Sequence, residues 1–564
     1  MNRWIVSPRQ RCDLELLLLG GFSPLAGFLS QEDYENVLSC NRLASGSLWP
    51  MPITLDVTTE FADKITVGDE IELSDSDNSV LAHMKVTDKW QPNKLTEAEV
   101  VFGTKDIYHP GVDYLFNKAN EWYLGGPVKL IRLPKHYDFI ALRHSPSTLK
   151  QYFLHEGLGN VVGFQTRNPI HRAHMELTLR AAQANNAHIL LHPVVGITKL
   201  GDVDYFTRVR CYQHVLQYYS TQQVTLSLLP LAMRMAGPRE ALWHALIRKN
   251  YGCTHFIIGR DHAGPGNNSH GQAFYDPYAA QKTVCAHQEE IGIKMVSFQE
   301  MVYVKERKQY CSIDEIKPQE TALTISGTEL RQALLTGQPI PTWFSYSEVI
   351  HELRQSYRAK HKQGFTIFFT GLSGSGKTTL ARNLLAKLMS LGKRNITILD
   401  GDVVRRILAT ELGFSKEDRN LNICRIGYVA AELTKIGGIV LCSAIAPYAK
   451  ARNENRRLIS EHGGYIEIYL STPLTICEMR DNKGLYDKAR RGKLKRFTGI
   501  DDPYEVPLNP EITIDTTKMT IEKSIENIIH YLEQEGYLKI EQTNLSTATS
   551  FSERHEQPTF GQYA

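Results

Sequence analysis

Hydrophobic and polar positions divide the chain into two kinds of pattern. Up to about residue 140, short apolar runs such as 51–57 and 70–73 are separated by turn-forming residues, which predicts a compact β-rich domain. From about residue 150, apolar runs at 161–164, 188–191, 224–227 and 255–258 alternate with helical patterns. This alternation predicts a parallel α/β sheet with its functional residues after the carboxyl ends of the strands.

A polar stretch near 351–363 precedes a second alternation of strands and helices. We therefore predict an α/β multidomain protein with a β-rich domain at 1–145, an α/β domain at 146–350, a linker at 351–363 and a second α/β domain at 364–540. The remaining residues, 541–564, are polar and poor in core-forming side chains, so this tail is expected to be disordered.

A complete P-loop motif, GLSGSGKT, follows the buried-type strand 365–370 and opens a helical pattern. Backbone N–H groups of such a loop wrap a polyphosphate, its lysine reaches the β and γ oxygens, and its threonine offers a hydroxyl to magnesium. The alternative is a glycine-rich turn before an ordinary helix. We predict ATP binding with Mg²⁺, and no zinc, at Gly371, Ser373, Gly374, Ser375, Gly376, Lys377, Thr378 and Thr379.

Two carboxylates, Asp400 and Asp402, follow the predicted strand 396–399. At that position they are suited to ordering magnesium and to accepting a hydroxyl proton, although a turn with two solvated acids has the same pattern. Arg405, Arg419 and Asn422 lie on helical segments beyond them and are candidates to hold a second anionic substrate. Phe497 fits either stacking on a purine or ordinary packing.

The middle domain concentrates polar side chains where its strands end. His171 and His174 are three residues apart, so we expect both on one face of a helix that starts near Ile170, with Pro169 near its start. Two imidazoles at a helix N-terminus suit the oxygens of a triphosphate, and Arg167 suits an oxyanion. Two unrelated surface histidines, or a fortuitous metal pair, would have the same spacing. Further polar groups come from Gln165 and Asn168, and from the glycine-rich segment 259–266 after the strand 255–258.

Composition excludes several other classes of protein. The chain has 564 residues, 42% of them hydrophobic, and a formal net charge of +3, which argues against a dedicated nucleic-acid surface. Nine cysteines without a CxxC pair indicate neither a disulfide framework nor a zinc ribbon, so a reducing cytoplasm is the expected compartment. No apolar run reaches the ~20 residues of a membrane span, and no membrane partner is expected.

The longer motifs resemble two known families. QTRNPIHRAH, HPVVGITKLGD and GRDHAGPG make residues 1–350 similar to ATP sulfurylase (sulfate adenylyltransferase). The P-loop, DNKGLYDKAR and FTGIDDPYE make residues 364–536 similar to adenylyl-sulfate kinase. The resemblance implies a PUA-like first domain, a Rossmann-like nucleotidylyltransferase domain and a P-loop kinase domain.

The resemblance also implies roles for individual residues. In the first site, sulfate would be held by Gln165, Arg167 and Ala263, and ATP by Gln165, Asn168, Gly259, Arg260, Asp261, His262 and Met301. Thr166, Arg167 and Asn168 would form the catalytic core, and His171 and His174 would stabilise the transition state. In the second site, Lys377 and Asp402 would be catalytic, and Arg405, Phe414, Arg419, Asn422 and Phe497 would surround adenylyl sulfate. Magnesium would be held indirectly by Thr378, Asp400 and Asp402.

The predicted function is sulfate activation by two reactions, ATP-dependent adenylylation of sulfate and 3′-phosphorylation of the product, in a homo-oligomer. The main alternative is a sulfurylase whose kinase-like domain only binds nucleotide and regulates; a generic P-loop GTPase lacks support because no Asn-Lys-x-Asp motif is present. The sequence departs from the kinase family at Val403, Cys424 and Ala446. Ala446 stands where the family often has a serine, which excludes a phosphoserine there and favours direct transfer.

Overall fold

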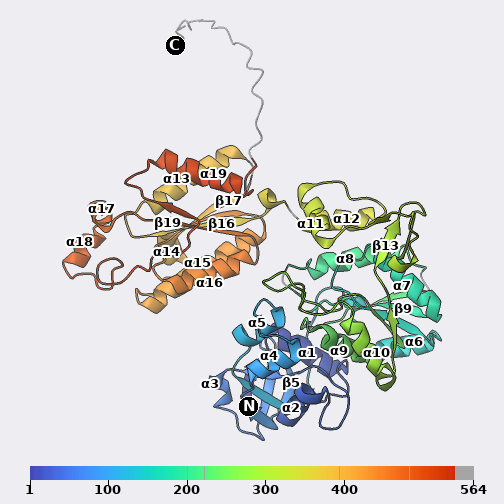
Figure 1. Cartoon of the computed structure of the whole chain (residues 1–564). Coiled ribbons are helices and arrows are strands. Elements are labelled where there is room, and N and C mark those ends of the chain that lie inside the picture. The colour runs from blue at the N-terminus through green and yellow to red at the C-terminus, as the bar shows by residue number, and fades with distance from the viewer. Residues whose placement is uncertain (200, 221–222, 358, 393, 482, 540–564) are drawn as a thin grey trace, which may run out of the picture. The chain divides into compact units, whose positions relative to one another are not determined.

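The computed structural model describes residues 1–199, 201–220, 223–357, 359–392, 394–481 and 483–539. The predicted tail, 541–564, lies outside the described residues. The chain divides into two compact units, Met1–Tyr357 and the remainder, and each contains a five-stranded parallel sheet (Figure 1).

The first unit begins with a seven-stranded, mainly antiparallel sheet. Its path is β1-β4-β5-β7-β2, and β3 and β6 also pair with β7. The strands are β1 (Asn2–Ile5), β2 (Gly27–Phe28), β3 (Leu55–Val57), β4 (Glu70–Ser74), β5 (Val80–Lys85), β6 (Asp88–Trp90) and β7 (Trp122–Leu130). The helices beside them are α1 (Pro8–Leu19), α2 (Gln31–Cys40), α3 (Thr59–Ala62), α4 (Lys94–Phe102) and α5 (Pro110–Asn117). The predicted β-rich domain is confirmed.

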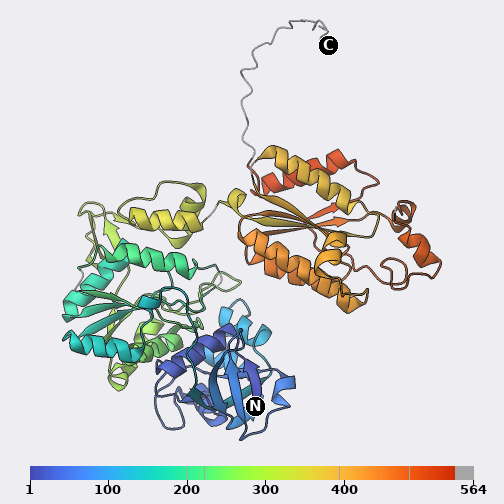
Figure 2. The ribbon, with the colours of Figure 1, turned by 180° about the vertical axis from the view of Figure 1, so that it is seen from behind.

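A five-stranded parallel sheet follows, in the order β10-β9-β8-β11-β12. Its strands are β8 (Val161–Phe164), β9 (His188–Leu191), β10 (Val224–Leu226), β11 (His255–Ile258) and β12 (Lys294–Ser297). Its helices are α6 (Pro146–His155), α7 (Arg172–Asn185), α8 (Tyr205–Leu216), α9 (Gly237–Asn250) and α10 (Ala279–Ile291). Every residue of β8, β9 and β11 is buried, because helices cover both faces of the sheet (Figures 1 and 2).

The order of the strands sets where a ligand can bind. From β8 the chain moves outward to β9 and β10, then returns to the other side of β8 for β11 and β12. The order therefore reverses between β8 and β11, and the loops that follow these two strands border a crevice at the carboxyl edge of the sheet.

A small antiparallel sheet and two helices complete the first unit: β13 (Met301–Val304), β14 (Gln309–Ser312), β15 (Ala322–Leu323), α11 (Gly327–Thr336) and α12 (Ser347–Ser356). Single 3-10 turns are η1 (Ile140–Leu142), η2 (Ile313–Glu315) and, after α12, η3 (Lys360–Lys362). Val349 and Leu353 of α12 are buried in the core of this unit. The stretch predicted as a linker, 351–363, therefore begins inside a packed helix, and the division between units follows Tyr357.

The second unit has the strand order β17-β18-β16-β19-β20. Its strands are β16 (Phe365–Gly371), β17 (Ile396–Asp400), β18 (Ile439–Ser443), β19 (Gly464–Leu470) and β20 (Ile512–Ile514). Its helices are α13 (Lys377–Leu391), α14 (Gly401–Leu408), α15 (Lys416–Lys435), α16 (Ala449–Ser460), α17 (Leu474–Met479), α18 (Leu485–Arg490) and α19 (Ile521–Gln534). Helices α13 and α19 cover one face of the sheet, and α15 and α16 cover the other (Figure 1).

Candidate active sites

Hydrogen bonds fix the backbone of the loop after β8. The hydroxyl of Thr166 donates to the carbonyl of Asn168 (3.1 Å) and accepts from its N–H (3.0 Å). Tyr212 of α8 donates to the same carbonyl at 2.5 Å, and the N–H of Val194 donates to the carbonyl of Thr166 at 3.1 Å. The Thr166 hydroxyl is thus engaged with the loop itself, so it shapes the site.

His171 and His174 lie together at the start of α7, but they are placed differently from the prediction. The backbone of His171 is extended (φ −120°), so this residue is the N-cap and the helix begins at Arg172, not near Ile170. Pro169 consequently lies before the helix. The centroids of the two rings are 5.9 Å apart; His171 is buried and His174 is half-buried.

Both imidazoles are neutral near pH 7. Burial, assisted by His174, lowers the pKa of His171 to about 3, and burial lowers the pKa of His174 to about 4. Nδ1 of His174 accepts the backbone N–H of His171 (3.2 Å), so the ring proton is on Nε2. His174 therefore presents a neutral N–H donor. Nδ1 of His171 pairs with the Ser345 hydroxyl at 2.8 Å.

Side chains connect the loops after β8, β9 and β11. Nη1 of Arg167 lies 2.5 Å from Oδ1 of Asp202, whose other oxygen accepts the N–H of Lys199. The Lys199 ammonium donates to the carbonyl of Pro265 at 2.5 Å. Arg167 is therefore held in place by the loop after β9, which is itself tied to the loop after β11.

The loop after β11 contains two non-glycine residues in the left-handed region, Asp261 (φ 51°) and Ala263 (φ 56°). The N–H of Asp261 donates to Pro277 (2.8 Å), and the carbonyl of Ala263 accepts from Gly237 (3.2 Å). Such conformations persist only where surrounding contacts impose them, and they concentrate at ligand sites. The His262 ring turns inward, toward His244 of α9.

A pocket of about 310 Å³ opens beside these loops. Of the predicted residues, Asn168, His171, His174 and Met301 line it, whereas Gln165, Thr166, Arg167 and 259–263 do not. The rest of its wall includes an apolar group that sequence reasoning missed: Leu323, Ile325, Leu330, Trp343 and Phe344. The only sequence signal nearby was the start of α11, where Ser326 and Glu329 form a capping box.

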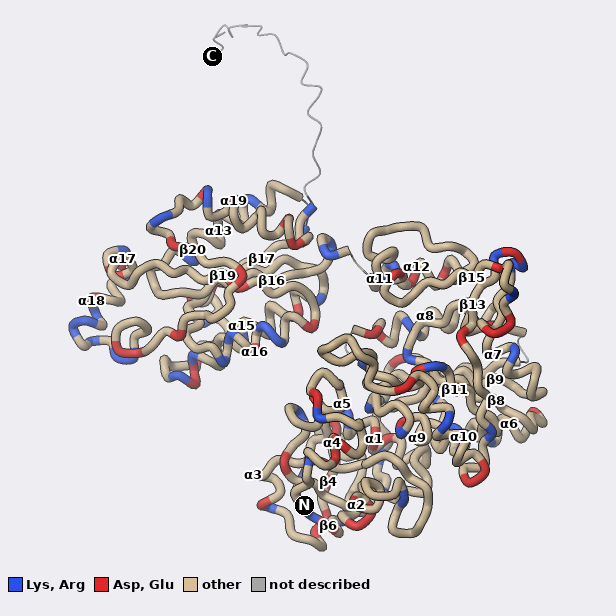
Figure 3. The backbone as a smooth tube through the Cα atoms, in the orientation of Figure 1, with Lys and Arg blue, Asp and Glu red and all other residues tan. Residues whose placement is uncertain are grey.

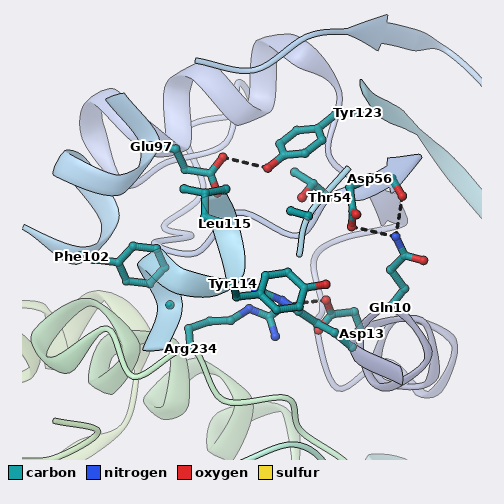
Figure 4. A pocket seen from close by; sticks show the side chains of 13 residues that line it. Gln10, Asp13, Thr54, Asp56, Glu97, Phe102, Tyr114, Leu115, Tyr123 and Arg234 are labelled. Carbon is teal, nitrogen blue, oxygen red and sulfur yellow. Dashed lines mark hydrogen bonds and ion pairs between the residues drawn. The ribbon is translucent and has the colours of Figure 1, made fainter. Parts of the chain in front are cut away.

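A second, smaller polar pocket joins the first sheet to the segment before α9. Arg234 reaches toward α1 and donates to Oδ2 of Asp13 at 2.5 Å, and both side chains are almost fully buried (Figure 4). Arg234 also donates to the carbonyl of Ala232 at 2.5 Å. This buried ion pair anchors the segment that leads into α9.

The P-loop of the second unit has the conformation that its glycines allow. Gly374 (φ 75°) and Gly376 (φ 100°) have positive φ, and a Cβ at Gly374 would come within 2.7 Å of the Cys477 carbonyl. The ammonium of Lys377 is buried and donates to the carbonyls of Gly371 (2.9 Å) and Leu372 (2.7 Å). Burial is the main cause that lowers its pKa to about 8.

Oxygen groups collect beside the P-loop, as a magnesium site requires. The Thr378 hydroxyl lies 2.9 Å from Oδ2 of Asp400 and 3.1 Å from the Ser443 hydroxyl. Asp400 ends β17 and caps α14 by accepting the N–H of Asp402 at 3.0 Å. A carboxylate and two hydroxyls suit Mg²⁺, which prefers oxygen ligands. Asp402 is more exposed and forms an ion pair with Lys483.

A large pocket of about 1100 Å³ contains most of the predicted second site. Its lining includes Ser373, Gly374, Gly376, Lys377, Thr378, Thr379, Asp400, Asp402, Arg405, Phe414, Arg419, Asn422 and Phe497. Lys and Arg positions recur along α18 and the loop after it (Figure 3), and Lys483, Lys488, Lys493, Lys495 and Arg496 also line the pocket. These cations provide a rim suited to anionic ligands.

Two predicted residues of this pocket, Arg419 and Phe497, contact other side chains of the second unit. Arg419 is 9% exposed, donates to the Thr498 hydroxyl (2.7 Å) and pairs with Asp502 (2.6 Å). Phe497 is buried and packs edge-on against Tyr486, with centroids 4.9 Å apart. Arg419 thus fixes the loop that carries Phe497.

The three departures from the kinase family differ in position. Val403, which is 39% exposed, and Cys424, which packs beside the core of α15, are not among the residues that line the pocket. Ala446 lines it, has a positive φ of 47°, and its carbonyl accepts from Arg452 at 2.7 Å.

Across the described part of the chain, no helix is both long and apolar enough to cross a membrane. The same residues contain no cluster of three or more His, Cys, Asp or Glu side chains that could hold a metal ion.

Comparisons with known proteins assign both units. Sequence models match a PUA-like domain at 1–133, ATP-sulfurylase at 141–356 and adenylylsulphate kinase at 363–515. Sulfate adenylyltransferase of Aspergillus fumigatus is 51% identical over 94% of this chain and 93% of that protein. The enzyme of Mycosarcoma maydis is 50% identical over 95% and 94%, respectively. The solved structure of a hexameric APS kinase from Thiobacillus denitrificans has a TM-score of 0.72 and 34% identity, covering 96% of this chain and 94% of that one.

Proposed function

We propose that this chain catalyses two consecutive reactions of sulfate activation. The chain belongs to the ATP-sulfurylase family and also carries an adenylylsulphate kinase domain, so it is both a transferase and a kinase. In the first, a sulfate oxygen attacks the α-phosphorus of ATP, which gives adenylyl sulfate and releases pyrophosphate. In the second, the 3′-hydroxyl of adenylyl sulfate attacks the γ-phosphorus of another ATP, which gives 3′-phosphoadenylyl sulfate, ADP and a proton.

In the first reaction, sulfate would lie against Gln165, Arg167 and the backbone of Ala263. The triphosphate would lie beside the start of α7, where the Nε2–H of His174 and the ring of His171 meet the charge that develops as pyrophosphate departs. Arg167 is already oriented by Asp202, so little reorganisation is needed when the anion binds.

In the second reaction, the P-loop would hold the phosphates, and Lys377 would turn from its own loop carbonyls to the β and γ oxygens. Thr378 and Asp400 would hold magnesium, which neutralises charge on the phosphates when bound. Asp402, at the start of α14, would accept the proton of the 3′-hydroxyl.

The observation that favours catalysis over a regulatory domain is the set formed by Lys377, Thr378 and Asp400. A domain that only binds product has no need of a phosphate-reaching lysine beside a hydroxyl–carboxylate pair 2.9 Å apart. All three side chains line one pocket with the candidate residues for adenylyl sulfate.

One assay separates the two functions. Purified protein receives adenylyl sulfate and γ-labelled ATP, and labelled 3′-phosphoadenylyl sulfate is measured. We expect product from the wild type and none from Lys377→Ala. If the wild type makes none while it still converts adenylyl sulfate and pyrophosphate to ATP, the kinase-like domain is regulatory.

We further propose a homo-oligomer in a reducing compartment such as the cytoplasm. The structural relative is described as hexameric, and all nine cysteines of this chain are free thiols. Light scattering of the purified chain tests the first statement: a mass of 63.9 kDa would contradict it.

A further inference from the structure

Behind the loops of the first site, α9 carries a fully buried pair, Glu240 and His244, for which the reaction above has no role. Oε1 of Glu240 accepts the N–H of Arg234 (2.9 Å), and Oε2 accepts the N–H of Ala236 (2.8 Å). Since both oxygens accept hydrogen bonds, the group is a carboxylate. Its pKa lies below the ordinary value, because these bonds and His244 outweigh the effect of burial.

The carboxylate determines which nitrogen of His244 carries the proton. Nε2 of His244 lies 3.2 Å from Oε1 of Glu240, and a carboxylate can only accept, so Nε2 bears the hydrogen. Burial, above all, lowers the pKa of His244, which leaves the ring neutral and Nδ1 an acceptor. Nδ1 lies 3.0 Å from Nε2 of His262, which must therefore donate.

The same Nε2–H also faces the side-chain amide of Gln165. The amide nitrogen is 3.3 Å from Nε2, and Oε1 of Gln165 is buried with no partner among the described residues. Two hydrogen-bearing nitrogens cannot bond to each other, and the oxygen and nitrogen of an amide are assigned from such networks. Turning the amide brings Oε1 to His244, which satisfies the oxygen, and places the NH₂ group at the buried position that has no partner among the described residues.

We propose that Glu240, acting through His244, is a positioning residue that fixes Gln165 as a hydrogen-bond donor and so makes the anion subsite selective for fully deprotonated oxyanions. This inference rests on the proposed function, which places sulfate at Gln165. Sulfate accepts hydrogen bonds at all four oxygens. Hydrogenphosphate has a similar shape and the same charge, but it carries one O–H group. That O–H needs an acceptor, and it would instead face the NH₂ group of Gln165, which can only donate.

His244 connects both sides of the subsite. It holds Gln165, which follows β8, and His262, which lies between the two strained residues of the loop after β11. The N-terminal domain supports the arrangement, because Asp13 holds the side chain of Arg234 (Figure 4). Glu240 holds the backbone of Arg234. Gln165 and the backbone near Ala263 are thus aligned by one imidazole.

The test compares two inhibitors of equal charge at pH 8, hydrogenphosphate and monofluorophosphate, which lacks the proton. Both compete with sulfate while pyrophosphate release from ATP is followed in the full-length protein. For the wild type, we expect the Ki of hydrogenphosphate to exceed that of monofluorophosphate by at least about 100-fold. In Glu240→Gln the new amide can donate to His244, so Nε2 of His244 no longer has to carry the hydrogen. Gln165 can then turn its oxygen toward the anion, and the ratio of the two Ki values should fall below about 10.

A purely structural role predicts a different result, because a distorted subsite weakens both inhibitors together and leaves their ratio unchanged. Glu290→Gln, which neutralises an exposed carboxylate on α10, is the matched control and should keep the wild-type ratio. If the Glu240 variant does not fold, His244→Asn removes the N–H that faces Gln165 and should lower the ratio equally.

Two results would overturn the proposal: a wild-type ratio near one, or an unchanged ratio in the folded variant. Absence of sulfate-dependent pyrophosphate release in the wild type would instead contradict the proposed adenylylation itself. Cooperative thermal unfolding of each variant, compared with the wild type, reports whether its first unit (Met1–Tyr357) is folded, and kinase activity of the second unit serves to normalise the amount of protein.

Discussion

Raising the pH should weaken the use of ATP by the second unit, with a midpoint near pH 8, because Lys377 loses its proton there. In the ligand-free protein its buried ammonium has two carbonyl partners, and burial lowers its pKa to about 8. A bound triphosphate favours the charged form and therefore raises this pKa. ATP thus binds the protonated protein, which is the dominant form below pH 8 and is lost above it.

The size of the effect follows from this pKa. The fraction of protonated Lys377 changes little below pH 7.5, and its fall approaches tenfold for each pH unit well above 8. Between pH 7.5 and 9.5, kcat/KM for ATP should therefore fall about 25-fold, equivalent to about 1.9 kcal/mol. The profile of kcat/KM is the appropriate measurement, since it reports the free enzyme.

The assay follows labelled 3′-phosphoadenylyl sulfate formed from adenylyl sulfate and γ-labelled ATP, with saturating magnesium. Inorganic pyrophosphatase is added so that the first unit cannot consume adenylyl sulfate. Lys377→Arg is the control: its guanidinium stays charged over this range, so its activity, although lower, should lack the alkaline limb. A flat wild-type profile, or the same limb in the arginine variant, would refute the assignment to Lys377.

Three further predictions concern buried charge and the metal site. Asp13→Ala leaves Arg234 buried without its carboxylate and should lower the free energy of unfolding by about 3–5 kcal/mol in urea titrations, whereas a loss below about 1 kcal/mol would contradict the anchoring role. Lowering the pH from 7.5 to 5.5 should reduce the free energy of unfolding by about 1.4 kcal/mol for each of His171 and His174. Their pKa values in the folded protein lie below the unfolded value of about 6.5, so stability is lost as the pH falls through that range. Over the same pH interval, the free energy of unfolding of the double variant with asparagine at both positions should fall by about 3 kcal/mol less than that of the wild type. An equal fall in both proteins would argue against neutral histidines. Asp400→Asn should lower kcat/KM of the kinase by about 100-fold or more and leave pyrophosphate release by the first unit unchanged; equal loss in both would indicate misfolding.

Much of the fold follows from patterns that the sequence displays directly. Buried strands of a parallel sheet are continuous apolar runs, so 161–164, 188–191 and 255–258 were placed at the residue level. Residues that follow such strands must meet at one edge of the sheet, and the contacts between Arg167, Asp202 and Lys199 agree with that expectation.

Features that depend on side-chain partners distant in sequence were not predictable in this way. Spacing placed His171 on a helix, but its N–H is capped by the His174 ring, and the extended backbone starts the helix later. Arg419 lines the pocket where it was expected, but its contact with Asp502, 83 residues away, could not be read from the sequence. Glu240 and His244 lie in an ordinary helical pattern, and only the folded chain brings them beside Gln165.

On the proposed mechanism, the first unit contacts the triphosphate of ATP through the neutral rings of His171 and His174, and the second unit through the charged Lys377. The two reactions explain this difference. The first reaction must release pyrophosphate. The neutral rings of His171 and His174 meet its developing charge while holding the departed product less tightly than ammonium groups would. The second reaction transfers only the γ-phosphoryl group. A charged lysine can therefore stay in contact with that group during transfer, because the nucleotide product no longer carries a triphosphate. Neither histidine titrates between pH 6 and 9 in the free protein, whereas Lys377 does. An alkaline loss of overall flux should therefore originate in the kinase step and appear as accumulated adenylyl sulfate.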